Sequence, residues 1–127
     1  MELVHHELCF GCGATNLFGL LLEVEKVAPG AVAGRCFIKQ DHQGPVRGRA
    51  HDGLVGAALV EAMALACGLE ARVRSFEVSL SAEAAVVGTF LKVEARVSDR
   101  DGSNAYATAT ASADQGMIAR ARGKFRL

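Results

Sequence analysis

The residue best suited to chemistry in this sequence is Glu61, the only charged residue between Leu54 and Leu69. In a helix, its neighbours three and four positions away would all be alanine or leucine. A carboxylate in such surroundings loses contact with water, and carboxylates of this kind are candidates for catalysis. We therefore interpret Glu61 as a candidate catalytic residue. The structural alternative is that a backbone amide or a subunit interface satisfies the carboxylate.

A second candidate site is His51-Asp52-Gly53, where this helix is expected to begin. Asp52 is a favourable N-cap or first-turn residue, because its carboxylate can accept hydrogen bonds from the free amides there. The same amides could instead hold a developing oxyanion on a thioester carbonyl. The two interpretations compete, since an anionic side chain on those amides would disfavour an oxyanion.

The spacing of the two sites predicts an assembly. Asp52 and Glu61 are nine residues apart, or roughly 13 Å along a helix, so one chain cannot place both against one carbonyl group. Two chains with antiparallel helices can, so function at Glu61 requires at least a homodimer, with a homotetramer left open. An isolated protomer would also expose large apolar side chains of the helix. These are Leu54, Val55, Leu59 and Met63.

Cys9 and Cys12 form a Cys-x-x-Cys motif that follows His5 and His6. A zinc site could use one of the histidines, both cysteines and one further ligand. A second Cys-x-x-Cys motif is absent from the sequence. We therefore favour a tight glycine-rich turn with half-buried thiols, and we expect neither a metal ion nor another cofactor.

The composition fits one domain over residues 1–127, because half of the residues are hydrophobic and disorder is excluded. The 14 basic and 14 acidic residues give a formal net charge of zero, so the overall charge does not indicate a nucleic acid or a membrane surface as a partner. The apolar stretch 54–69 is too short and too interrupted to span a bilayer. The first residues lack the pattern of a signal peptide, and we expect a cytoplasmic location.

The hydrophobic pattern predicts one helix and six strands. The helix covers residues 54–67 and ends at Gly68, after a loop over 40–49. Residues 1–16 read as an irregular arm. Hairpin turns are expected at Pro29-Gly30, Asp101-Gly102 and Gln115-Gly116. The expected strands are 17–27, 30–39, 73–80, 89–99, 104–113 and 117–127.

The order of these elements predicts an α+β hotdog fold, in which an antiparallel sheet wraps around a central buried helix. The helix is apolar on every side, and such a helix must be buried all round. Alanine occupies every second position in 105–113, and this small-residue face lets a helix approach the sheet closely. A plain α+β sandwich is the alternative, but it would leave one face of the helix exposed.

Three segments resemble the hotdog thioesterases of the phenylacetyl-CoA thioesterase-like group. One is Cys-Phe-Gly-Cys-Gly at 9–13, with Asn16 and Gly19-Leu20 after it. The others are 42–44 followed by 48–53, and Glu61-Ala62-Met63. The resemblance covers almost the whole chain. It implies hydrolysis of an acyl thioester, carried by coenzyme A or by a carrier protein, without a metal and with coenzyme A only as part of the substrate.

The resemblance also assigns roles to residues of this chain. In that group, the amide after the motif histidine polarises the carbonyl, which points to Asp52, where the group has glycine. The helix carboxylate of the group falls on Val60 here. Either Glu61 takes over its role, or the protein binds acyl thioesters without efficient hydrolysis. The implied catalytic residues are Glu61, Asp52 and His51, and those expected at the substrate are His42, Gln43, Gly53 and Val60.

Residues 56–68 further resemble the central helix of hotdog acyl-carrier-protein dehydratases, in which the glutamate is catalytic. The partner histidine of that group falls on Arg47 here. Dehydration needs that histidine as a base, so we rank a dehydratase below a thioesterase and below a non-catalytic binding protein.

Overall fold

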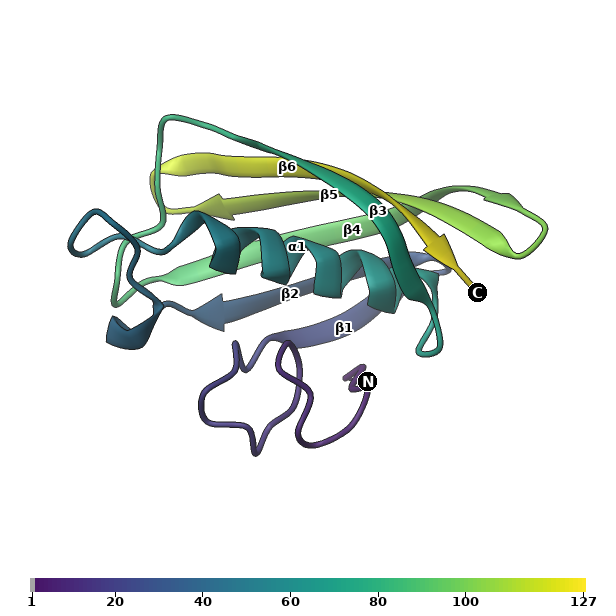
Figure 1. Ribbon diagram of the computed structural model, residues 1–127, viewed down its shortest axis with the longest axis horizontal. Coiled ribbons are helices and arrows are strands. Elements are labelled where there is room, and N and C mark those ends of the chain that lie inside the picture. The colour runs from purple at the N-terminus through teal and green to yellow at the C-terminus, as the bar shows by residue number, and fades with distance from the viewer. Residues whose placement is uncertain (1) are drawn as a thin grey trace.

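A computed structural model describes residues 2–127, which form one six-stranded antiparallel sheet and one long helix, α1 (Asp52–Cys67) (Figure 1). A short 3-10 helix, η1 (Gln40–His42), precedes α1. The strands are β1 (Glu23–Ala28), β2 (Ala31–Phe37), β3 (Arg72–Leu80), β4 (Phe90–Asp101), β5 (Asn104–Ala113) and β6 (Gly116–Arg126). Their order across the sheet is β1-β2-β4-β5-β6-β3, so β1 and β3 are the edge strands.

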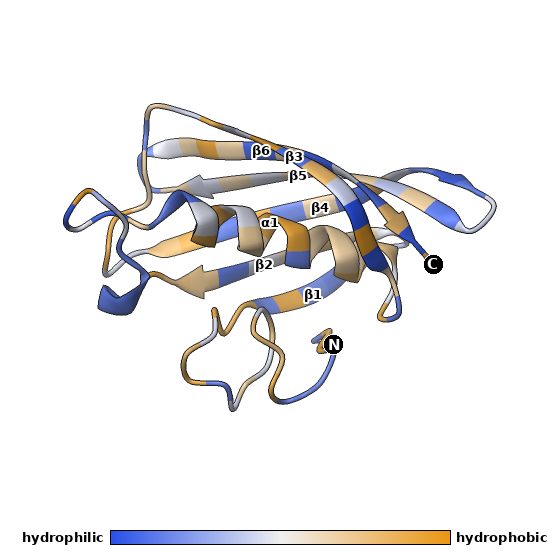
Figure 2. Cartoon of the chain, viewed as in Figure 1, coloured by the Kyte–Doolittle hydropathy of each residue, from blue (hydrophilic) through white to orange (hydrophobic). Residues whose placement is uncertain are grey.

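The mostly hydrophobic helix α1 lies across one face of the curved sheet (Figure 2). The alanines of β5 at positions 105, 107, 109 and 111 are buried, as their alternation predicted. On β6, a Cβ added to Gly123 would lie 3.4 Å from Cε of Met63 on the helix. The small residues of these strands therefore allow the helix to pack close to the sheet. The antiparallel sheet around a central helix confirms the hotdog fold expected from the sequence.

One protomer already buries most of the helix. Val55, Leu59 and Met63 are at most 2% exposed, whereas Leu54 is half-buried. We expected an isolated protomer to expose the side chains of these residues. This is wrong for Val55, Leu59 and Met63, because the sheet covers them. In residues 2–127, α1 included, no helix is long and apolar enough to cross a bilayer.

The element boundaries agree with the sequence prediction to within two residues, except at the start of the first strand. Helix α1 begins at Asp52, two residues before the predicted start, because His51 caps it. The first strand begins only at Glu23, so the prediction of a strand over 17–27 is wrong for residues 17–22 and confirmed from Glu23 on. That segment belongs to the arm, where the Leu20 amide donates to the carbonyl of Phe10. The hairpin turn at Gly102 is confirmed, with a φ of +61° that glycine adopts without strain.

The two edges of the sheet differ in how they are covered. The arm runs along β1, where Glu2 bridges to Glu25 and the Leu3 amide donates to the carbonyl of Val24. On its outer side, β3 pairs with no other strand of residues 2–127. Three of its four apolar side chains are 40–51% exposed, namely Val73, Phe76 and Leu80, and the fourth, Val78, packs against the core. The β3 edge is therefore the place where a second sheet can continue the ladder.

Candidate functional site

The arm folds back against the middle of α1 through its Cys-x-x-Cys turn. The Gly13 amide donates to the carbonyl of Cys9 at 2.9 Å and closes this turn. A Cβ added to Gly11 would lie 2.4 Å from Cδ of Glu61. The turn backbone therefore rests directly on the carboxylate, and glycine is the residue that fits there.

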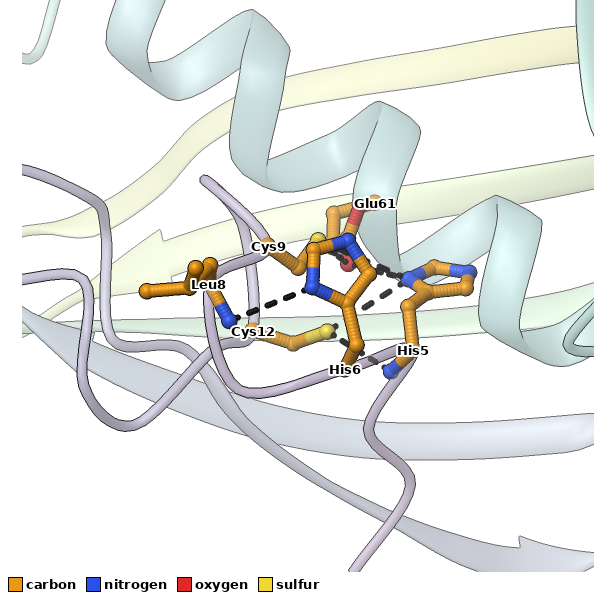
Figure 3. A network of polar contacts seen from close by, with 6 residues as sticks. All are labelled: His5, His6, Leu8, Cys9, Cys12 and Glu61. Carbon is orange, nitrogen blue, oxygen red and sulfur yellow. Dashed lines mark hydrogen bonds and ion pairs between the residues drawn. The ribbon is translucent and has the colours of Figure 1, made fainter.

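Four side chains meet at this contact, as Figure 3 shows. Oε2 of Glu61 lies 2.9 Å from Nδ1 of His5 and 3.4 Å from Sγ of Cys9. Sγ of Cys12 lies 3.4 Å from the same His5 nitrogen. One ligand atom from each of the four residues lies within 4.8 Å of the others. The partners of Glu61 therefore come from the arm, a source that the sequence analysis did not consider.

The cluster of His5, Cys9, Cys12 and Glu61 is largely shielded from water, since the side chains of His5 and Glu61 are 19% and 15% exposed. Burial, followed by the contact with Glu61, raises the pKa of the Cys12 thiol. All four cysteines of the chain are free thiols. His6 is exposed, and its ring accepts from the amide of Leu8 rather than joining the cluster. The arrangement offers two sulfur ligands, one nitrogen and one oxygen to a metal ion.

The start of α1 is capped by His51 and not by Asp52. Nδ1 of His51 accepts from the Gly53 amide at 2.8 Å, while its carbonyl accepts from Leu54 and Val55. Asp52 is exposed, and its own amide has no acceptor among residues 2–127. Asp52 lies in the first turn of α1, one of the two positions predicted for it, but its carboxylate accepts no hydrogen bond from an amide of residues 2–127 and so does not compete with an oxyanion for one. The free amide points out of a helix start that carries a partial positive charge.

A cavity of about 210 Å³ lies beside this helix start. Asp52 and Val55 line it from α1, together with Arg49 and the segment 81–85. Glu61 is not among its lining residues. Within one protomer, the Asp52 amide and the Glu61 carboxylate therefore do not face the same cavity, as their spacing along the helix predicted.

His42 and Gln43 fold the loop that leads into α1. The ring of His42 is buried and its Nδ1 accepts from the Lys39 amide at 3.1 Å. The side chain of Gln43 bridges the loop, accepting from the Gly48 amide at 2.6 Å. The His51 amide donates to the carbonyl of His42 and so ties the cap to this loop. Contacts of His42, Gln43, Gly53 and the half-buried Val60 with a substrate stay predictions.

Three solved structures show the same fold. The E. coli PaaI protein from the phenylacetic acid degradation operon matches with a TM-score of 0.76 and 16% identity, covering 84% of this chain and 79% of that chain. Zebrafish thioesterase superfamily member 2 matches with a TM-score of 0.74 and 20% identity, over 84% and 80%. A hypothetical thioesterase protein of Streptococcus pneumoniae, solved with coenzyme A, matches with a TM-score of 0.74 and 14% identity, over 83% and 84%.

Two of these neighbours are named thioesterases and the third comes from a phenylacetic acid degradation operon, in agreement with the resemblance found in the sequence. At 14–20% identity, they show a shared fold. No protein-family model and no curated protein matches the chain.

The buried ring of His42 predicts a loss of stability in acid. Burial, followed by the positive charge of Lys39, lowers the pKa of His42 against the smaller opposing effects of the Gly19 backbone and of Asp41. Protonation of Nδ1 would also break its bond with the Lys39 amide. Below the ordinary pKa of 6.5, the unfolded chain therefore binds a proton that the folded chain refuses, and stability falls with pH. Urea unfolding from about pH 8 to about pH 5.5 measures the decline.

We expect His42→Gln to flatten this pH dependence, even though the variant is less stable at neutral pH. His6→Gln is the matched control, because His6 is exposed, and its profile should follow that of the wild type. A His42→Gln profile as steep as that of the wild type would contradict the assignment.

Proposed function

We propose that this protein is an acyl-thioester hydrolase. The observation that carries the proposal is the free amide of Asp52 at the start of the central helix, beside a cavity. A helix start stabilises negative charge, which is what the carbonyl oxygen of a thioester gains when water attacks it. The solved neighbours support the choice of substrate, since two are named thioesterases and one holds coenzyme A.

In the proposed reaction, the thioester carbonyl accepts a hydrogen bond from the Asp52 amide. The His51 cap holds the turn in the orientation that aims this amide outward. The acyl group enters the cavity beside Val55, and the thiol leaves when the tetrahedral intermediate collapses. Attack requires a group that activates water or adds to the carbonyl itself.

Glu61 of a partner subunit supplies this group in the proposal. Two subunits share the site in this proposal, because the carboxylate in the same chain does not line the cavity at Asp52. A second protomer that pairs at the free β3 edge would lay its helix antiparallel to α1. Its Glu61 would reach the Asp52 amide only after leaving His5 and Cys9 of the arm, which runs along the opposite edge strand β1. We therefore propose a homodimer, and a dimer of such dimers would preserve the same site.

A non-catalytic acyl-thioester-binding protein is the second candidate. It is favoured by the contacts that already engage Glu61 with His5 and Cys9, and by Val60, which stands where the resemblance expects the carboxylate. A dehydratase gains no support, because Arg47 is exposed and offers no base at the position of the required histidine. For either candidate, we propose a cytoplasmic location, where thiols stay reduced.

Replacing Asp52 tests the role of its amide directly. Proline removes the N–H but suits the first position of a helix, and the extended backbone of His51 (ψ 139°) suits a residue before proline. We expect Asp52→Pro to lower kcat/KM by about 100- to 1000-fold on the best acyl-CoA of a panel. Asp52→Ala keeps the amide and should stay within about threefold of the wild type. Equal activity of the two variants would contradict the proposal.

Replacing Glu61 tests the carboxylate. We expect Glu61→Gln to lower kcat by about 10²- to 10⁴-fold, since the amide is a poor base and a poor nucleophile. Glu94→Gln is the control, because it removes the same charge from an exposed carboxylate on β4 that lies outside the cluster and the cavity. Unchanged turnover by Glu61→Gln would remove Glu61 from the mechanism. Binding of acyl-CoA by the wild type with no hydrolysis at all would establish the second candidate instead.

The proposed assembly is tested by sedimentation equilibrium at low micromolar concentration. We expect at least twice the chain mass of 13.3 kDa. Phe76→Lys places a charge on the free β3 edge and should give a folded monomer without hydrolytic activity. Val27→Lys makes the same change on β1, the other edge strand, and should remain a dimer. A well-folded wild-type monomer would contradict both the dimer and the shared site.

A further inference from the structure

We propose that the cluster of His5, Cys9, Cys12 and Glu61 binds one zinc ion, which fastens the N-terminal arm to the central helix. The proposal concerns a different activity of the molecule from thioester hydrolysis and does not rest on it. It replaces the expectation, drawn from the sequence, that Cys9 and Cys12 form a turn without a metal.

Four of the six distances within the cluster lie within about half an ångström of the edges of a zinc tetrahedron, and the other two are below 4.8 Å. Zinc bonds of about 2.3 Å to sulfur and about 2.1 Å to nitrogen or oxygen place sulfur about 3.6 Å from either atom, and nitrogen about 3.4 Å from oxygen. The two sulfurs lie 3.7 and 3.4 Å from Nδ1 of His5. Sγ of Cys9 lies 3.4 Å from Oε2 of Glu61, and this oxygen lies 2.9 Å from the His5 nitrogen. Shifts of about half an ångström would therefore admit the ion.

The backbone around the cluster is built for this close approach. Gly11 lies against Glu61, and a Cβ on Gly13 would lie 2.4 Å from the carbonyl oxygen of Glu7. The His5 amide donates to Sγ of Cys12 at 3.2 Å, which offsets the negative charge of a thiolate ligand. The arm is also held at its far end, where Leu3 bonds to β1. Three ligands thus sit on a braced loop and the fourth on a rigid helix.

The two sulfur, one nitrogen and one oxygen donor atoms of the cluster favour zinc and a structural role for it. Thiolates favour zinc over magnesium and calcium, which prefer ligand shells of oxygen alone. Four protein ligands leave no open position for water, and closed sites of this kind are structural rather than catalytic. The ion would thus hold together a part of the chain that lacks regular strands. The competing description is a metal-free cluster in which Cys9 donates to Glu61.

Zinc content and stability of the full chain decide between the two descriptions. The protein is purified with a phosphine reductant, which keeps the thiols free, stripped with a chelator and titrated with Zn²⁺ against a chromophoric competitor. We expect one ion per chain and a rise in Tm of roughly 10 °C at a hundredfold excess of free zinc over Kd. Substituted Co²⁺ should show the intense visible bands of a tetrahedral thiolate site. Absence of stoichiometric zinc binding would overturn the proposal without any variant.

Variants identify the ligands. We expect Cys9→Ser, His5→Ala and Glu61→Gln each to weaken zinc binding by at least roughly a hundredfold. His6→Ala and Cys36→Ala are matched controls outside the cluster and should bind like the wild type. Wild-type affinity in Glu61→Gln or in Cys9→Ser would place the ion elsewhere and overturn the assignment. Asp52→Pro should bind zinc normally, so loss of the thioesterase proposal and loss of the zinc proposal are separate outcomes.

Discussion

The arm, the turn and the helix depend on one constraint, which is the charge of Glu61 in the middle of an apolar helix. A half-buried carboxylate without partners costs several kcal/mol, so the fold must supply them. The sheet offers alanine and glycine toward α1, and the partners that Glu61 has come from His5 and the Cys9 thiol. The arm meets this requirement, because His5 and Cys9 bring it across the helix where the carboxylate lies.

The same requirement places the two candidate activities in competition. A carboxylate that holds a metal ion cannot accept a proton from water or attack a carbonyl group. If Glu61 of the partner faces the Asp52 amide, hydrolysis belongs to the metal-free state of the cluster. If zinc occupies the cluster, the Asp52 amide can still bind a thioester carbonyl. The chemistry of the protein is thus decided at one side chain that two regions of the chain share.

The sequence predicts the elements well, because apolar periodicity and glycine turns are local signals. It fails where a contact is long-range. Asp is a better N-cap than His in general, yet His51 takes the position, because its amide is bonded to the carbonyl of His42 in the preceding loop. Likewise, Cys9 and Glu61 are 52 positions apart. Two features of the sequence pointed to this contact. The Cys-x-x-Cys motif lacked a further metal ligand nearby in the sequence, and the Glu61 carboxylate lacked a polar partner on its own helix.

The arm also determines which edge of the sheet is open. It covers β1 through Glu2 and Leu3, and it reaches that edge from the cluster at Glu61. An uncovered β1 would be a second pairing edge and would allow open-ended association of sheets. With the first half of β1 covered, β3 is the edge that stays free along its whole length, and pairing there closes after two chains. The contacts of Glu61 with His5 and Cys9 hold the arm on the helix, and they therefore also favour a closed dimer over a sheet that grows by further pairing. In this way the partners of one buried carboxylate influence the symmetry of the assembly.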